Sequence, residues 1–201
     1  MVTIKAWAGV HHTRLASMVL VVTAVVSLLA ARTALTRIGG IVLHFPVAVL
    51  LLPAIAGVGA AIACSTAAAM SLPDPPRALV ARATWAALWV LAAIAATSVG
   101  LIVGPAVTWE PVARNVLVHC SLALLLVTAR QEHLLWLPPL LLTYSSMMFG
   151  IPDDPERIEP YWWALILAEQ VDGKTWATVV GLSLFTLVLY VTVPHLRQRR
   201  R

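Results

Sequence analysis

Charged side chains are scarce in this chain. Lys, Arg, Asp and Glu together make up 11% of its 201 residues, whereas 60% are hydrophobic and the mean hydropathy is +0.88. Soluble globular domains carry about 25% charged residues. The shortage of charge excludes a water-soluble domain and predicts a chain whose main solvent is lipid.

Cysteines and clustered metal ligands are also rare. The two cysteines, Cys64 and Cys120, lie in apolar runs, which excludes a disulfide framework and favours packing roles. The histidines His44 and His119 lie in apolar runs without a second ligand at helical spacing, so metal binding has no support. No apolar run holds an acidic residue near its centre, which argues against a proton-coupled or cation-coupled transporter.

Apolar runs recur along the whole chain, so we expect no cleaved signal peptide. Taking about 20 residues as the length that crosses the hydrocarbon core, we predict helical spans over residues 15–31, 41–68, 83–104, 113–129, 134–150 and 175–194. Only four residues separate the fourth and fifth spans, which should therefore form a tight antiparallel hairpin. The predicted fold class is an all-α integral membrane protein of about six transmembrane helices, with residues 1–201 as a single transmembrane domain.

The Lys and Arg residues predict the orientation in the membrane. With a cytoplasmic N-terminus, nine lie in inner segments and five in outer ones. The inner residues are Lys5, Arg14, Arg77, Arg82, Arg130, Arg197, Arg199, Arg200 and Arg201, and the outer residues are Arg32, Arg37, Arg114, Arg157 and Lys174. We therefore expect a multi-pass membrane protein with both termini cytoplasmic. The basic C-terminal run favours contact with anionic lipid over nucleic acid, so we expect no nucleic acid as a partner.

Three segments outside the spans have a distinct character. Residues 1–14 combine apolar and basic side chains and predict an inner interfacial helix, with a frayed basic tail as the alternative. Residues 71–82, SLPDPPRALVAR, predict a proline-rich turn that leads into a short basic helix on the cytoplasmic side. Residues 151–174 carry acidic side chains around an apolar centre that is too short to cross. With Tyr161, Trp162 and Trp163, this centre predicts a re-entrant or interfacial helix on the outer side.

Small and proline residues predict where helices pack and bend. Gly and Ala are dense in the second and third spans, which makes these spans candidate packing or dimer surfaces. Kinks or short breaks are expected at Pro46, Pro53, Pro138 and Pro139. Two further side chains have ordinary interpretations: Ser183 as a hydroxyl that bonds its own helix, and His119 as a residue near the interface.

No short motif predicts catalysis. Gly173, Lys174 and Thr175 resemble the end of a phosphate-binding loop, but Ala168 occupies the position of the required earlier glycine. Ser183 lacks the following glycine that an intramembrane serine protease would need. We therefore predict no catalytic, cofactor-binding or metal-binding residue in this chain.

The order of these segments resembles the membrane (permease) subunit of an ABC-2, or type V, ABC exporter. The shared layout is an inner interfacial helix, six spans, a cytoplasmic helix after the second span and an outer re-entrant segment before the last. The Arg114–Asn115 pair that opens the fourth span, with residues 135–139, also resembles small permease-like proteins of high-GC Gram-positive bacteria, and this resemblance implies a bacterial cell membrane.

The resemblance implies an ATP-driven transport subunit. In that class the loop after the second span couples to the ATPase, which would assign this role to Asp74, Arg77 and Arg82. The translocation path would be lined by the second and fifth spans, whose prolines are Pro46, Pro53, Pro138 and Pro139. The chain has no nucleotide loop of its own, so ATP and Mg would be held by separate ABC ATPase subunits. A second membrane subunit, identical or homologous, would complete the path, and the cargo would be amphipathic, lipid-like, or a peptide or antibiotic.

Two other function classes stay open. One is a non-catalytic membrane protein that binds a partner, such as an immunity protein. The other is a membrane-embedded enzyme acting on lipid, with the outer acids Asp153, Asp154 and Glu156 as its reactive groups. A solvated outer loop is the favoured explanation of these acids.

Overall fold

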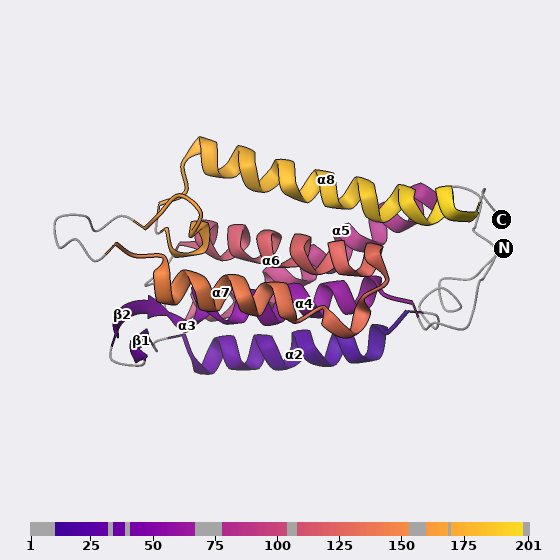
Figure 1. Cartoon of the computed structure of the whole chain (residues 1–201). Coiled ribbons are helices and arrows are strands. Elements are labelled where there is room, and N and C mark those ends of the chain that lie inside the picture. Colours follow the sequence, from indigo (N-terminus) through magenta and orange to yellow (C-terminus); the bar gives the residue numbers. More distant parts are fainter. Residues whose placement is uncertain are drawn as a thin grey trace.

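The computed structural model describes residues 11–31, 34–38, 41–66, 78–103, 108–152, 160–168 and 170–198, with side chains undescribed at 32–48, 78 and 194–198. Six helices exceed ten residues (Figure 1). They are α2 (Thr13–Leu29), α4 (Leu52–Cys64), α5 (Ala78–Ser98), α6 (Trp109–Ala129), α7 (Leu137–Phe149) and α8 (Gly173–Gln198). The shorter elements are β1 (Ala34–Ile38), β2 (Ile41–Pro46), α3 (Val47–Leu50) and the 3-10 turns η1 (Val99–Ile102), η2 (Glu132–Leu134) and η3 (Leu165–Leu167). The predicted helical fold is thus confirmed, with one small hairpin added.

Three helical segments are long and apolar enough to cross a membrane: Leu79–Ile102, Trp109–Ala129 and Gly173–Val193. The helices Thr13–Leu29 and Leu52–Cys64 are apolar but shorter. Large hydrophobic side chains lie exposed along α2, α5 and α8, among them Val21, Leu29, Leu88, Leu91, Leu184 and Phe185. Water would penalise this outer surface, whereas hydrocarbon would not.

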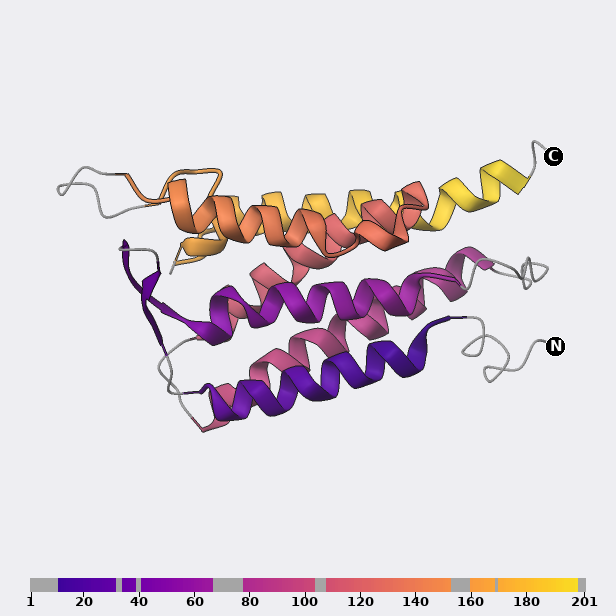
Figure 2. The same ribbon diagram turned by 60° about the horizontal axis from the view of Figure 1, so that its bottom comes forward.

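The helices run roughly side by side, with α4 and α6 at the centre (Figures 1 and 2). α2 and α5 pack on α4, while α8 packs on α6. The first turn of α2 and the last turn of α8 lie at the same end of the bundle, which we call the proximal end. The opposite, distal end carries the hairpin, α3, η3 and the first turns of α6 and α8.

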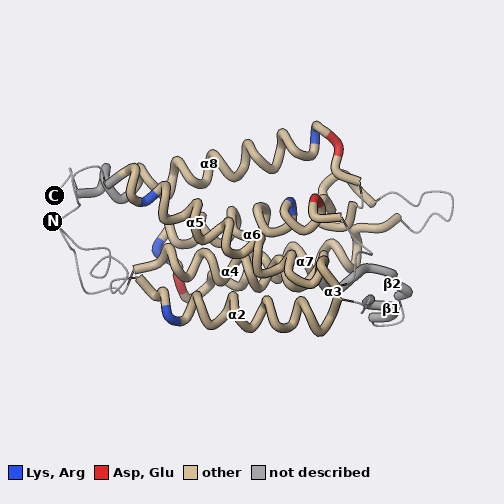
Figure 3. The backbone as a smooth tube through the Cα atoms, turned by 180° about the vertical axis from the view of Figure 1, so that it is seen from behind, with Lys and Arg blue, Asp and Glu red and all other residues tan. Residues whose placement is uncertain are grey.

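Charged and aromatic side chains mark the two ends of the bundle. The charged residues of the described chain lie toward the ends and leave the middle uncharged (Figure 3). At the distal end the rings of Trp109 and Trp176 are 6.4 Å apart, and at the proximal end the indole N–H of Trp136 donates to the carbonyl of His133 at 3.1 Å. Trp at both interfaces is typical of proteins that span a bilayer.

The second predicted span begins later than expected. Residues 41–46 do not open a helix but form β2, which pairs antiparallel with β1, so that Ile38 lies opposite Ile41. Two glycines, at positions 39 and 40, separate these partners, and a two-residue Gly-Gly connection flanked by β-branched residues is a hairpin signal. Pro46 ends β2 and therefore does not lie within a transmembrane helix.

The predicted break at Pro53 is confirmed. α3 and α4 are separated at Leu51, and Pro53 lies in the first turn of α4. The backbone of Leu51 stays in the right-handed helical region, so the path bends little although one helical hydrogen bond is missing. Pro138 lies in the first turn of α7, where the ring interrupts nothing.

The fourth and fifth predicted spans form the expected tight antiparallel pair, α6 and α7. Arg130 ends α6 with a positive φ of 63°, its N–H bonds the carbonyl of Val127, and the next N–H bonds that of Leu126. This pair of bonds is a Schellman motif that closes the helix and reverses the chain. α7 starts at Leu137 rather than at residue 134, because η2 occupies the preceding turn.

The separate cytoplasmic helix predicted within residues 71–82 is not found over its described part. α5 begins at Ala78 and continues to Ser98, since no glycine or proline interrupts this stretch. Residues 71–77 lie outside the described residues, as do residues 1–10 of the predicted interfacial helix. Residues 13 and 14 already belong to α2.

The small residues of α4 confirm the predicted packing surface within the chain. A Cβ at Gly57 would lie 2.7 Å from the backbone nitrogen of Cys120 on α6, and one at Gly59 would lie 2.9 Å from Val19 Cγ1 on α2. Cys64 and Cys120 are both buried and free, in agreement with packing roles. Glycine therefore permits α4 to contact two neighbours at close range.

Candidate functional site

Three large polar side chains that are fully buried in the bundle lie on one helix. Arg114, Asn115 and His119 of α6 all have 0% exposure. The sequence analysis counted Arg114 among the outer charges, which stays a prediction, although the residue lies inside the bundle rather than in a loop. The interfacial position predicted for His119 is wrong. α6 starts at Trp109, which places Arg114 in the second turn of the helix and His119 near its middle.

Arg114 binds backbone carbonyls of a segment far away in the sequence. Its Nη1 donates to the carbonyl of Ala168 at 2.7 Å and its Nη2 to that of Ile166 at 3.1 Å. Its Nε donates to the Oδ1 of Asn115 at 2.8 Å. All three acceptors are neutral, so the guanidinium charge is solvated by protein dipoles.

Asn115 completes the arrangement by joining a third element. Its Nδ2 donates to Ile166 at 2.9 Å and to the carbonyl of Val49 in α3 at 2.7 Å. In a regular helix the carbonyl of Val49 would accept the N–H of residue 53, and proline has none. The amide of Asn115 therefore replaces the donor that Pro53 lacks.

We name Arg114 and Asn115, with the carbonyls of Val49, Ile166 and Ala168, the carbonyl clamp. It ties α3 and the 161–168 segment to α6 at the distal end. Five hydrogen bonds satisfy groups that neither lipid nor an apolar core would satisfy. The clamp thus fixes a piece of irregular backbone inside the bundle.

The segment held by the clamp corresponds to the predicted outer re-entrant segment. Ala164, Ile166 and Leu167 are buried, whereas Tyr161 and Trp162 are exposed. The segment does not cross the bundle but turns back at the distal end, and the rings of Tyr161 and Trp163 stack 6.4 Å apart. The expected helix is absent from residues 160–168, which form a turn and the 3-10 element η3.

His119 lies one helical turn beyond Asn115 on the same side of α6. Neither imidazole nitrogen has a hydrogen-bond partner within the described chain, and the side chain is fully buried. Its Cβ lies against Gly57 of α4. An unsatisfied buried imidazole costs folding free energy, which is typical of residues kept for a task other than stability.

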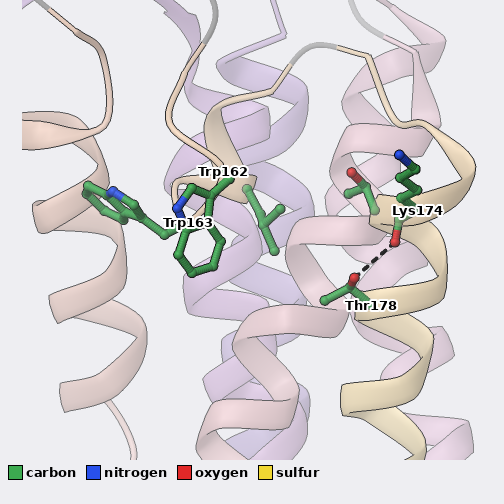
Figure 4. A pocket seen from close by; sticks show the side chains of 6 residues that line it. Trp162, Trp163, Lys174 and Thr178 are labelled. Carbon is green, nitrogen blue, oxygen red and sulfur yellow. Dashed lines mark hydrogen bonds between the residues drawn. The ribbon is translucent and has the colours of Figure 1, made fainter.

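A groove opens beside the clamp, between residues 161–168 and the first turns of α8. It has a volume of about 470 Å³ and is lined by Trp162, Trp163, Leu165, Lys174, Thr175 and Thr178 (Figure 4). Asp172 caps α8: the N–H of Thr175 donates to its Oδ1 at 2.8 Å. Hydrogen bonds from the side chain and backbone of Thr175 lower the pKa of the Asp172 carboxyl below its ordinary value.

The residues predicted from the sequence do not gather at one place. Asp74 and Arg77 lie outside the described residues, and Arg82 lies partly buried in the second turn of α5 at the proximal end. Pro53 is buried near the distal end, whereas Pro138 and Pro139 start α7 at the proximal end. Pro46 ends β2 of the hairpin, so the four prolines are divided between the two ends of the bundle.

Sequence reasoning missed the carbonyl clamp and misjudged one hydroxyl. The available signal was an Arg–Asn pair inside a long apolar run, with His119 four residues after Asn115. Ser183 bonds the Oγ of Ser121 at 3.1 Å, so it joins α8 to α6 rather than bonding its own helix. Among the described residues, no three His, Cys, Asp or Glu side chains are grouped as metal ligands.

Comparison of the chain with protein-family models, with curated proteins and with solved structures finds no match. The functional argument therefore rests on the residues and geometry described above.

Proposed function

We propose that this chain is the permease subunit of an ATP-driven ABC exporter of the ABC-2 class. ATP and Mg are held by separate ATPase subunits, and a second membrane subunit, identical or homologous, completes the path. The chain itself performs no catalysis. Its cargo is amphipathic: a lipid-like molecule, a peptide or an antibiotic.

The observation that supports this proposal is the segment of residues 161–168 between α7 and α8, which turns back at the distal end. An apolar stretch that does not cross, placed before the last helix, is the layout that the resemblance implies. The carbonyl clamp supports it, because Arg114 holds Ile166 and Ala168 inside the distal end instead of leaving them in solvent. A buried arginine is expensive in a bilayer, and such residues are typical of functional parts of membrane proteins.

The distribution of charge supports an orientation for the proposed subunit. Arg14, Arg82 and Arg130 lie at the proximal end, where both termini of the described chain also lie. We place this end in the cytoplasm of a bacterial cell, because basic residues accumulate on the cytoplasmic side. The re-entrant segment then faces outward.

In the proposed mechanism the ATPase acts on the proximal end. Asp74, Arg77 and Arg82 would receive the movement of the ATPase when ATP binds. Because α5 is continuous from Ala78 to Ser98 and packs on α2 and α4, a displacement of its start would be transmitted along the whole bundle. The clamp would hold the distal end as one unit during this movement.

The test is co-purification with the products of neighbouring genes in mild detergent, followed by mass spectrometry and an ATPase assay. The proposal expects a stoichiometric ATPase whose activity rises when it is bound to this chain. Repeated absence of an ATPase would instead indicate a membrane protein that only binds a partner. Metal-dependent turnover of lipid by the isolated chain would indicate an enzyme.

A charge reversal tests the coupling surface itself. Arg82→Glu is expected to abolish ATPase stimulation while the chain still inserts and elutes as a single species. The matched control is Arg14→Glu, a basic residue exposed in the first turn of α2 at the same end. Equal loss in both variants, or loss in neither, would remove Arg82 from the mechanism.

A further inference from the structure

The groove beside η3 combines an apolar wall with one cation. Two indoles and Leu165 form one side, and Lys174, Thr175 and Thr178 of α8 form the other (Figure 4). We infer that this groove binds one membrane phospholipid, with the headgroup phosphate on Lys174 and the upper part of an acyl chain along Trp162, Trp163 and Leu165. The inference does not depend on the ATPase partner.

The groove lies at the depth where phospholipid headgroups are found. α8 begins at Gly173 at the distal end, and Trp176, in its first turn, contacts the ring of Trp109 at the start of α6. Trp side chains of this kind concentrate at the boundary between hydrocarbon and headgroups. Lys174 therefore stands at the level of the phosphates, and the remainder of α8 below it at the level of the acyl chains.

The wall of the groove suits an acyl chain. Trp162 is 85% exposed, which is unusual for the largest apolar side chain and leaves its ring for a neighbour outside the protein. Trp163 and Leu165 are partly buried, so the wall is anchored in the re-entrant segment that the clamp holds. The volume of about 470 Å³ falls within the range of sites that hold small molecules.

The charges of the groove suit a single phosphate. The carboxylate of Asp172 is directed at its own helix, because it accepts the N–H of Thr175. The side chain of Lys174 rises along the first turn of α8 toward the distal end (Figure 4). One cation beside one capped carboxylate gives little net charge, which favours a monoanionic phosphodiester over a polyanion such as a nucleotide.

The experiment measures how much lipid the full-length chain retains. The protein is purified in mild detergent, exposed to phosphatidylglycerol or to a diglucosyl diacylglycerol with the same acyl chains, and examined by native mass spectrometry. We expect retention of phosphatidylglycerol and not of the phosphate-free lipid. Lys174→Ala is expected to lower the retained phospholipid about tenfold, because one charge-assisted hydrogen bond to the phosphate is lost. Lys174→Arg is expected to retain the phospholipid, because it keeps the positive charge.

Two further variants separate charge from shape. Thr178→Phe fills the groove without changing charge and is expected to reduce retention to the same extent as Lys174→Ala. Arg130→Ala removes a cation at the proximal end and is expected to leave retention unchanged. Unfolding temperature is measured for each variant, so that loss of lipid is distinguished from loss of fold.

Three results would overturn the inference. Equal retention of both lipids by the unaltered protein would mean that the groove does not recognise the phosphate group. Unchanged retention in Lys174→Ala would remove the proposed cation. Full displacement of lipid by glycerol 3-phosphate at matched concentration would mean that the ligand is a soluble phosphate ester.

Discussion

The side-chain amide of Asn115 donates a 2.7 Å hydrogen bond to the backbone carbonyl of Val49. This carbonyl lies four residues before Pro53, so it has no donor within its own helix. A proline in α4 and an asparagine in α6 are therefore parts of one arrangement. Pro53 leaves a carbonyl without a donor inside an apolar bundle, and the buried amide of Asn115 supplies that donor.

A double-mutant cycle tests this relationship. Asn115→Leu is expected to cost about 2 to 4 kcal/mol, because it leaves the Val49 carbonyl and the Nε–H of Arg114 without partners, whereas the Ile166 carbonyl keeps its bond from Arg114. Pro53→Ala restores an N–H for Val49, so the double variant should recover about 1 kcal/mol of that loss. Unfolding of the purified protein in detergent, followed by circular dichroism, gives the four free energies. Strictly additive values would show that Asn115 does not compensate Pro53.

Part of this fold follows from local patterns. The runs of apolar residues predicted six helical segments, and five of them begin within about five residues of the observed helix. The hairpin was missed because residues 41–46 are mostly apolar and continue into the following helix. The whole apolar run is long enough to cross a membrane, so it was assigned to one helix despite the preceding Gly-Gly pair. The start of α6 was predicted too late because Glu110 and Pro111 resemble loop residues. The first turn of a helix accepts both residue types.

The carbonyl clamp could be identified only from the three-dimensional structure. Asn115 and Ile166 are 51 residues apart, and no periodicity in the sequence joins them. The acceptors are backbone carbonyls, which every residue has, so side-chain chemistry does not identify them. A buried Arg–Asn pair therefore predicts that partners exist, and the fold alone identifies which ones.

The close contact of α4 with α6 gives a second prediction. Gly57→Ala places a Cβ 2.7 Å from the nitrogen of Cys120 and 2.9 Å from His119 Cβ, and helix backbone moves only at a cost. We expect a loss of about 1 to 3 kcal/mol in unfolding free energy. Gly181→Ala is the matched control, since a Cβ there meets nothing within 4 Å. That control should be neutral or stabilising by up to about 1 kcal/mol. Equal stability of the two variants would contradict the packing seen here.

Ser27 gives a third prediction, at the end of α5. Its hydroxyl donates to the carbonyl of Thr97 at 2.7 Å and accepts the N–H of Gly100 at 3.0 Å. Both backbone groups lie where α5 changes to η1, and one side chain from α2 satisfies them. Ser27→Ala should cost about 1 to 3 kcal/mol, because a buried N–H loses its partner. Ser17→Ala, an exposed serine of the same helix, should leave thermal unfolding unchanged; a comparable shift in both would refute the assignment.

Asp172 predicts a pH dependence confined to the start of α8. Hydrogen bonds from Thr175 lower its pKa below the ordinary 3.8. A carboxyl with a lowered folded pKa contributes stability above its unfolded pKa and loses it as pH falls through the folded value. Hydrogen exchange at the amides of Thr175 and Trp176 should therefore quicken, relative to intrinsic rates, as pH falls below about 4. Asp172→Asn keeps a capping oxygen and should remove this dependence, whereas Asp172→Ala should fray the turn at every pH. An unaltered pH profile in Asp172→Asn would rule out this carboxyl as its cause.

The turn between α6 and α7 can be stabilised by a single substitution. Arg130 has a φ of 63°, a left-handed conformation that costs a non-glycine residue about 1 kcal/mol. Arg130→Gly should therefore raise the unfolding free energy by about 0.5 to 1 kcal/mol. Arg130→Ala is the control, because it removes the same charge and keeps the unfavourable backbone. If both variants change stability equally, the charge of Arg130 matters and its conformation does not. A gain in Arg130→Gly alone would establish that the backbone of this residue, and not its side chain, limits the stability of the turn.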